Sequence, residues 1–179
     1  GCGSRKQPAE GTATELHAKA LALQDASGTR LVIVTTDLIG IPRPLRDRVA
    51  ARVMKQFKLP PASLLLNASH THCGPELRMT STALEELSGE RQKLTTEYCH
   101  RLEGALVALV GDSLNDCSPA RLSYSHARAG FAMNRRLKNP DPEGEPYLNH
   151  PNPDGPVDHD VPVLQVTWKS PVRHAILFG

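Results

Sequence analysis

Two histidines one residue apart, His70 and His72, are the residues of this chain best suited to do chemistry. They follow an apolar and then polar run, 64–69, and a Gly-Pro pair comes shortly after them. Because side chains alternate along a β-strand, a strand that leaves its sheet here would turn both imidazoles to one face. Imidazole nitrogen is a common ligand of zinc, so this spacing predicts half of a zinc site.

A surface role or a simple hydrogen bond is the alternative for these two histidines. The chain holds eight histidines in 179 residues, so chance alone readily produces such a pair. Position favours chemistry, because polar groups at the carboxyl end of an apolar strand stand where open α/β sheets hold their ligands. From the spacing alone, both interpretations stay open.

Asp37 is a second candidate, because it follows the β-branched run 31–36. That run is typical of a central strand with both faces covered, and 44–57 has the apolar period of a helix. A further strand over 63–69 would complete a β-α-β unit with parallel strands. Parallel strands end at one edge, so Asp37 is expected to share a crevice with the histidines, although a turn role is commoner for a lone Asp.

The rest of the sequence predicts an α/β fold with a mixed central sheet flanked by helices. Gly111 is expected to end a long helix. Segment 139–162 holds seven prolines among 24 residues and predicts a long loop without regular structure. The chain stops within an apolar strand, so we expect a single partial domain over 1–179, incomplete at its C-terminus. The remaining predicted elements are strands over 16–23, 120–127, 163–168 and 173–178 and a helix over 94–114.

Composition limits the function classes. A hydrophobic content of 39% with 22% charged residues is ordinary for a globular domain. A net charge of +2, scattered basic residues and only three Tyr, three Phe and one Trp argue against a nucleic-acid partner. No apolar run reaches the roughly 18 residues of a transmembrane helix, and no charged-then-apolar leader follows Gly1.

The four cysteines show no C-x-x-C pair and no regular spacing. Free or buried thiols are therefore the leading interpretation. A disulfide or metal role for Cys2 and Cys73, which could both lie near the histidines, is the alternative.

Residues 67–75 read Asn-Ala-Ser-His-Thr-His-Cys-Gly-Pro. This segment resembles the Ser-His-Thr-His-Ser-Gly-Pro signature in the N-terminal catalytic domain of the neutral/alkaline non-lysosomal ceramidases. Cys73 departs from the pattern, since the family usually has a hydroxyl residue there. Other segments resemble the family in the expected order, namely a glycine turn at 3–6, a strand ending in Asp at 31–38, an Asn-Arg element at 133–136 and a Val-Asp strand start at 157–164.

The resemblance implies a zinc-dependent hydrolase of N-acylsphingosine or a related lipid amide. It implies that His70 is a zinc ligand, and that His72 stands beside the metal as a ligand or as the group that handles protons. Arg135 aligns with a substrate-side arginine and is expected to act in catalysis, while Asn134 and Asp37 are expected to bind substrate. Further ligands, a His, a Glu and a Tyr, would come from later sequence, so the 179-residue chain alone is expected to be inactive.

Two other function classes stay open. One is a non-catalytic binding or structural domain of the same fold, and the other is a metallohydrolase that cleaves a different ester or amide. The expected partners are a lipid amide, zinc and the remaining C-terminal part of the same polypeptide, with peripheral contact to a membrane surface. The resemblance favours a secreted or periplasmic location.

Overall fold

The computed structural model describes residues 9–75, 77, 87–169 and 173–179. Helices and strands both occur in these residues, which confirms the predicted α/β class. The chain divides into two compact units, Gly1–Cys117 and Ser118–Gly179. A single partial domain over 1–179 stays a prediction, since two units of this size can belong to one larger domain.

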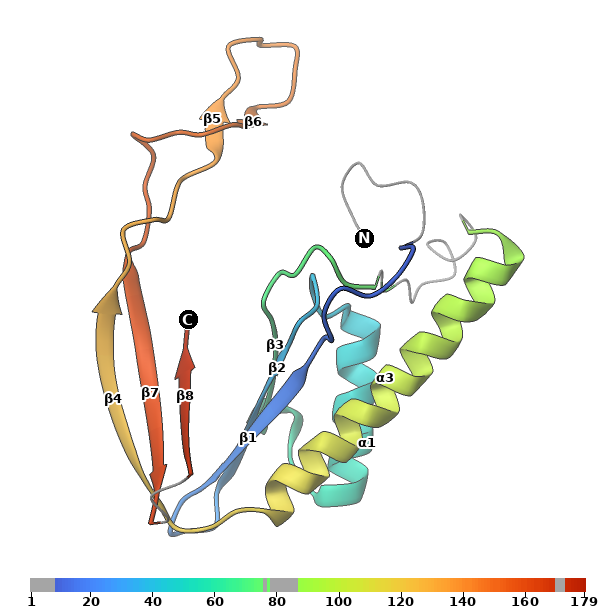
Figure 1. The fold of residues 1–179 in the computed structure, drawn as a ribbon, viewed down its shortest axis with the longest axis vertical. Helices are drawn as coiled ribbons and strands as arrows, with labels where there is room; N and C mark the ends of the chain where they lie inside the picture. Colours follow the sequence, from blue (N-terminus) through green and yellow to red (C-terminus); the bar gives the residue numbers. More distant parts are fainter. Residues whose placement is uncertain (1–8, 76, 78–86, 170–172) are drawn as a thin grey trace. The chain divides into compact units, whose positions relative to one another are not determined.

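The first unit contains a three-stranded sheet in the order β1-β2-β3 (Figure 1). β1 runs antiparallel to β2 and β3 runs parallel to it, so the sheet is mixed, as predicted. Thr36 is the register partner of both Ala18 and Ala68, so the start of β1 and the ends of β2 and β3 meet at one edge. The strands are β1 (Ala18–Gln24), β2 (Arg30–Thr36) and β3 (Leu64–Ala68).

Two helices lie on the same side of this sheet (Figure 1). α1 (Arg43–Phe57) is the predicted crossover between β2 and β3, and η1 (Pro61–Ser63) leads from it into β3. α3 (Gly89–Asn115) begins five residues before the predicted start. The mixed sequence of 76–89 predicts a loop with one helical turn, and this segment lies mostly outside the described residues.

Apolar side chains on the helix side of the sheet form the core. Val32 and Val34 of β2 are fully buried, whereas Leu31 and Leu65, which point to the other face, are 38% and 52% exposed. The run 31–36 predicted a strand that is buried on both faces. The structure instead buries the helix side of β2 more completely than the other side. The helices contribute Leu45, Val49, Ala50, Val53, Leu106, Val107 and Val110 to this core.

Gly111 lies inside α3 and does not end it, contrary to the prediction. A Cβ at this position would lie 2.4 Å from Cζ of Phe57. The glycine therefore admits the aromatic ring at the end of α1, and the helix continues to Asn115. Close helix packing explains this glycine better than a helix end does.

Glu103 is a buried acidic residue between the helices, only 7% exposed. Its carboxylate pairs with Arg48 at 3.3 Å and with Arg52 at 2.9 Å. Two arginines of α1 thus pair with a buried carboxylate, and a charge in the protein interior requires such partners. Among the described residues, no helix has the length and apolar character needed to cross a membrane.

The second unit contains an antiparallel sheet in the order β4-β7-β8. β7 and β8 form the predicted hairpin, and the residues 170–172 that connect them lie outside the described residues. Ile176 and Phe178 are 56% and 71% exposed, so the last strand is less buried than its apolar sequence predicted. The strands are β4 (Ala120–Arg128), β7 (Asp160–Trp168) and β8 (His174–Phe178).

Residues 129–159, here called the arm, connect β4 to β7 and extend beyond the ends of these strands (Figure 1). β5 (Arg136–Lys138) pairs antiparallel with β6 (Tyr147–Asn149) within the arm. The segment 139–162 was predicted to lack regular structure, and this prediction is wrong. The sequence did not predict this strand pairing, because prolines are typical of turns and lie on both sides of β6.

Candidate functional site

The two histidines lie in a turn that follows β3, residues 69–74, here called the histidine turn. Their ring centroids are 4.8 Å apart, with the edge of one ring toward the face of the other. Strand alternation does not bring them together, because β3 ends at Ala68. His70 instead has a φ of 57°, so the chain leaves the extended conformation between the two rings.

Backbone hydrogen bonds hold the histidine turn against the end of β2. The N–H of Ser69 donates to the carbonyl of Thr36 at 3.0 Å, and the N–H of Thr71 donates to the carbonyl of Leu38 at 2.9 Å. At Gly74, an added Cβ would lie 3.4 Å from the carbonyl oxygen of Asp37. The turn therefore continues the contact between β2 and β3 beyond the last strand residue.

The ring of His70 is fixed by a hydrogen bond between its Nδ1 and the carbonyl oxygen of Ile39, at 3.0 Å. A carbonyl oxygen only accepts, so Nδ1 carries the proton of the neutral ring and Nε2 keeps its lone pair. A histidine held in this way is typical of metal sites, where the second ring nitrogen binds the metal. Both His70 and His72 are exposed, so the rings are accessible to a solute.

The residues on both sides of His70, Ser69 and Thr71, carry hydroxyl groups. The hydroxyl oxygens of Ser69 and Thr71 are 2.7 Å apart, across the histidine between them. The Ser69 hydroxyl also lies 3.3 Å from the carbonyl of Thr36, to which it can donate, and either hydroxyl can be the donor in the 2.7 Å bond.

Asp37 lies at the same edge of the sheet, directly after β2, as predicted. Its carboxylate accepts the backbone N–H of His17 at 2.9 Å, and its own N–H donates to the carbonyl of His17 at 2.9 Å. His17 directly precedes β1, and the antiparallel pairing of β1 with β2 brings it to this edge. The substrate-binding role of Asp37 stays a prediction.

The histidine pair fits part of a zinc site. Two imidazoles that share a tetrahedral zinc have ring centres about 5 Å apart, given Zn–N bonds of about 2.0 Å. The observed 4.8 Å matches this spacing, although aromatic rings also pack edge to face at such distances. No group of three His, Cys, Asp or Glu side chains suited to a metal is found in the part of the chain that the structure describes.

Asn134 and Arg135, the predicted substrate-side residues, lie in the arm of the second unit. Arg135 donates from Nε to the side-chain oxygen of Asn149 at 3.1 Å and from Nη2 to its carbonyl at 3.3 Å. Asn134 donates to the carbonyl of Pro156 at 2.9 Å and accepts the N–H of Arg136 at 2.9 Å. Both side chains thus stabilise the arm, and their roles toward a substrate stay predictions.

The cysteines described by the structure form no disulfide with one another. Cys73 and Cys117 are exposed and Cys99 is buried, in line with the leading interpretation of free or buried thiols. Cys2, the proposed neighbour of Cys73, lies outside the described residues.

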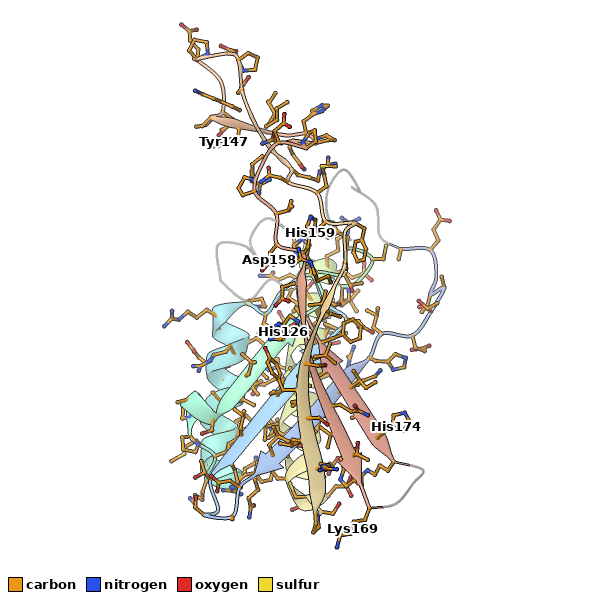
Figure 2. The ribbon with its side chains drawn as sticks, turned by 90° about the vertical axis from the view of Figure 1, so that its left-hand side faces the viewer. His126, Tyr147, Asp158, His159, Lys169 and His174 are labelled. Carbon is orange, nitrogen blue, oxygen red and sulfur yellow. The ribbon has the colours of Figure 1, made fainter. Side chains whose placement is uncertain are left out.

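A pairing that the sequence analysis did not identify links β4 to β7. Nδ1 of His126 lies 2.7 Å from a carboxylate oxygen of Asp160, and the ring of Tyr124 packs edge-on against His126 with centroids 4.9 Å apart. His159 is also held through its Nδ1, which lies 3.1 Å from the carbonyl oxygen of Ala129. Figure 2 shows His126 on β4 and His159 where the arm enters β7.

Comparison with known proteins finds matches among solved structures. No protein-family model and no curated protein sequence matches the chain. The structure is similar to a ceramidase complexed with C2, at 27% identity and a TM-score of 0.57, and to neutral ceramidase from Pseudomonas aeruginosa, at 24% identity and a TM-score of 0.56. Each match covers 83% of this chain and 23% of the ceramidase, so the chain spans about a quarter of those proteins. The predicted resemblance is thus confirmed, and the chain has a ceramidase-like fold.

Proposed function

We propose that this chain, with its ceramidase-like fold, contributes part of a zinc-dependent amide hydrolase that acts on N-acylsphingosine or a related lipid amide. The observation that carries the proposal is the pair of exposed imidazoles, 4.8 Å apart, where β2 and β3 end. The similarity to two ceramidase structures supports the choice of reaction class over that of a non-catalytic domain.

In this proposal His70 holds zinc through Nε2, because Nδ1 is occupied by the carbonyl of Ile39. His72, whose ring lies beside that of His70, serves as a second ligand or moves a proton during amide cleavage. When bound, zinc polarises a carbonyl group and lowers the pKa of water enough to supply a nucleophile at neutral pH. The carboxylate of Asp37, oriented by the N–H of His17, would accept a hydrogen bond from the substrate.

Arg135 is proposed to meet the substrate as well. Its side chain is exposed, and its planar guanidinium can hold a carbonyl or carboxylate group through two hydrogen bonds. It would exchange its present bonds to Asn149 for the substrate while Asn134 keeps the arm folded. The remaining zinc ligands are proposed to lie in parts of the protein other than these 179 residues.

Zinc titration of two proteins tests the proposal, the 179-residue chain and a full-length protein that contains it. We expect weak binding and no amide hydrolysis by the chain alone, and tight one-to-one binding with zinc-dependent cleavage of N-acylsphingosine by the full-length protein. His70→Gln should abolish both properties of the full-length protein, whereas His100→Gln, on the exposed side of α3, serves as the matched control. Cleavage that persists after complete zinc removal would contradict the proposal. Sub-micromolar zinc binding with turnover by the chain alone would contradict the assignment of further ligands to other parts of the protein.

A further inference from the structure

His70 has a backbone conformation that a histidine seldom adopts. Among the described residues, only Lys58 and His70 combine a side chain with a positive φ, at 55° and 57°. Lys58 caps the end of α1, where a left-handed residue is ordinary. His70 follows a strand, so its conformation costs free energy that the surrounding contacts must offset.

The contacts that offset this cost come from the residues on both sides of His70. Ser69 and Thr71 are each tied to β2 or its exit through their N–H groups, at 3.0 and 2.9 Å. Their hydroxyls then meet at 2.7 Å, which closes a small ring around residue 70. Ser69 is exposed and Thr71 is half-buried, so the bond lies at the surface of the turn. Together with the two backbone bonds, it defines the geometry of the turn.

The turn geometry determines which nitrogen of His70 faces a ligand. With residue 70 in the left-handed conformation, its Nδ1 reaches the carbonyl of Ile39 at 3.0 Å. Neutral imidazole has one donor and one acceptor nitrogen, so this bond leaves Nε2 as the acceptor. An extended residue 70 would point its ring elsewhere, because the direction of Cβ follows φ and ψ.

We propose that Ser69 and Thr71 are positioning residues whose hydroxyl pair keeps His70 in the Nδ1–H form with Nε2 ready for a metal. The part of this inference that concerns metal rests on the proposed function. The two hydroxyls touch neither metal nor substrate in this arrangement and act only through His70. Preorganised ligands of this kind bind metal more tightly, because less freedom is lost when the metal binds.

The decisive measurement is the tautomer of His70 in the metal-free, folded 179-residue chain. Nitrogen-15 NMR of histidine-labelled protein, at a pH where the ring is neutral, reports which nitrogen carries the proton, and the spectrum of His70→Gln assigns the signal. We expect the Nδ1–H form to predominate in the unaltered chain. In Thr71→Val and in Ser69→Ala, the tautomer ratio should move toward that of the urea-unfolded chain. Thr71→Ser and Ser69→Thr keep a hydroxyl and should restore the original ratio.

Matched controls are Ser123→Ala and Thr167→Val, which remove exposed hydroxyls from β4 and β7. They should leave the His70 signal unchanged. Because Ser69 is exposed, Ser69→Ala decides the question if Thr71→Val fails to fold. An unchanged tautomer ratio in the folded variants would overturn the proposal.

Zinc binding by the same proteins gives a second reading. We expect the dissociation constant for zinc to rise about tenfold in Thr71→Val and to recover in Thr71→Ser. A tautomer preference that disappears in the variants supports the positioning role even if the full-length protein binds no zinc. A tautomer effect without zinc binding would contradict the proposed metal centre but not the positioning role of Ser69 and Thr71. The experiment therefore distinguishes failure of one proposal from failure of the other.

Discussion

The histidine turn and the arm are both segments that leave the end of a sheet, and hydrogen bonds hold both in place. They differ in which groups those bonds use. In the histidine turn the bonds involve backbone, hydroxyls and one nitrogen of His70, and they leave Nε2 with its lone pair. In the arm the bonds engage the side chains of Asn134 and Arg135 themselves.

This difference separates two ways of using a polar side chain. A ring nitrogen that stays open after its partner nitrogen is held is prepared to bind something else. A guanidinium and an amide that already satisfy the surrounding backbone primarily stabilise their own segment. The histidine turn is therefore the better candidate for chemistry in the first unit. The arginine of the arm already bonds within its own segment and would have to change partners to meet a substrate.

The sharpest test of the comparison is catalysis by a full-length protein that contains this chain. If His70 holds zinc as proposed, His70→Asn should reduce kcat/KM for amide hydrolysis roughly thousandfold, since loss of a metal ligand removes several kcal/mol of transition-state stabilisation. Arg135→Ala should have a smaller effect, because the arm uses that side chain structurally. If Arg135→Ala were the more damaging of the two, the comparison would be reversed.

The rigidity of the arm can be tested at Gly155. A Cβ at this position would lie 2.5 Å from Cγ of Asn134, so Gly155→Ala should destabilise the arm by about 1–3 kcal/mol. Hydrogen exchange of the β5–β6 amides measures the loss of protection. Gly130→Ala is the control, because nothing lies within 4 Å of a Cβ built there. Equal exchange in the two variants would show that the asparagine contacts do not fix the arm.

The strain in the histidine turn can be measured with two substitutions at one position. His70→Ala and His70→Gly both lose the imidazole, but only glycine adopts a φ of 57° without cost. The glycine variant should be more stable by about 1–2 kcal/mol in urea unfolding, and the difference isolates the backbone term from the lost side chain. Two variants of equal stability would mean that residue 70 is not strained in solution.

The smallest effect is expected at the base of the arm, where His126 and Asp160 pair across β4 and β7. Their side chains are 52% and 39% exposed, so solvent screens the pair. A double-mutant cycle with His126→Ala and Asp160→Ala should give a coupling of about 0.2–1 kcal/mol in urea unfolding. A much larger coupling would show that this pair, rather than the asparagines within the arm, controls how the arm is held.

Sequence patterns were sufficient to predict much of the fold of the first unit. The apolar runs and the order strand, helix, strand predicted the parallel pairing of β2 with β3, because a crossover helix allows few other arrangements. They also placed Asp37 at the edge where the histidines lie. The nearness of the two imidazoles was predicted correctly, but for the wrong reason, since a left-handed residue and not strand alternation brings them together.

Features that depend on contacts between distant residues could not be predicted from sequence. Gly111 looked like a helix end because glycine favours such ends, and only the position of Phe57 shows its packing role. The β5–β6 pairing was hidden because each strand is three residues long, too short for a periodic signal. His17 was missed because its neighbour at the sheet edge, Asp37, is 20 residues away in the sequence.

The parallel pairing of β2 with β3 also has a consequence for folding, because the histidine turn packs against the end of β2. Val32 pairs with Leu64, so the two partners are 32 positions apart in the sequence, and the chain between them includes the whole of α1. In an unfolded chain Ile39, before α1, and His70, after β3, are not held together, so nothing orients the His70 ring. The histidine turn therefore depends on this long-range pairing, and any ion that binds it would report that the first unit has folded.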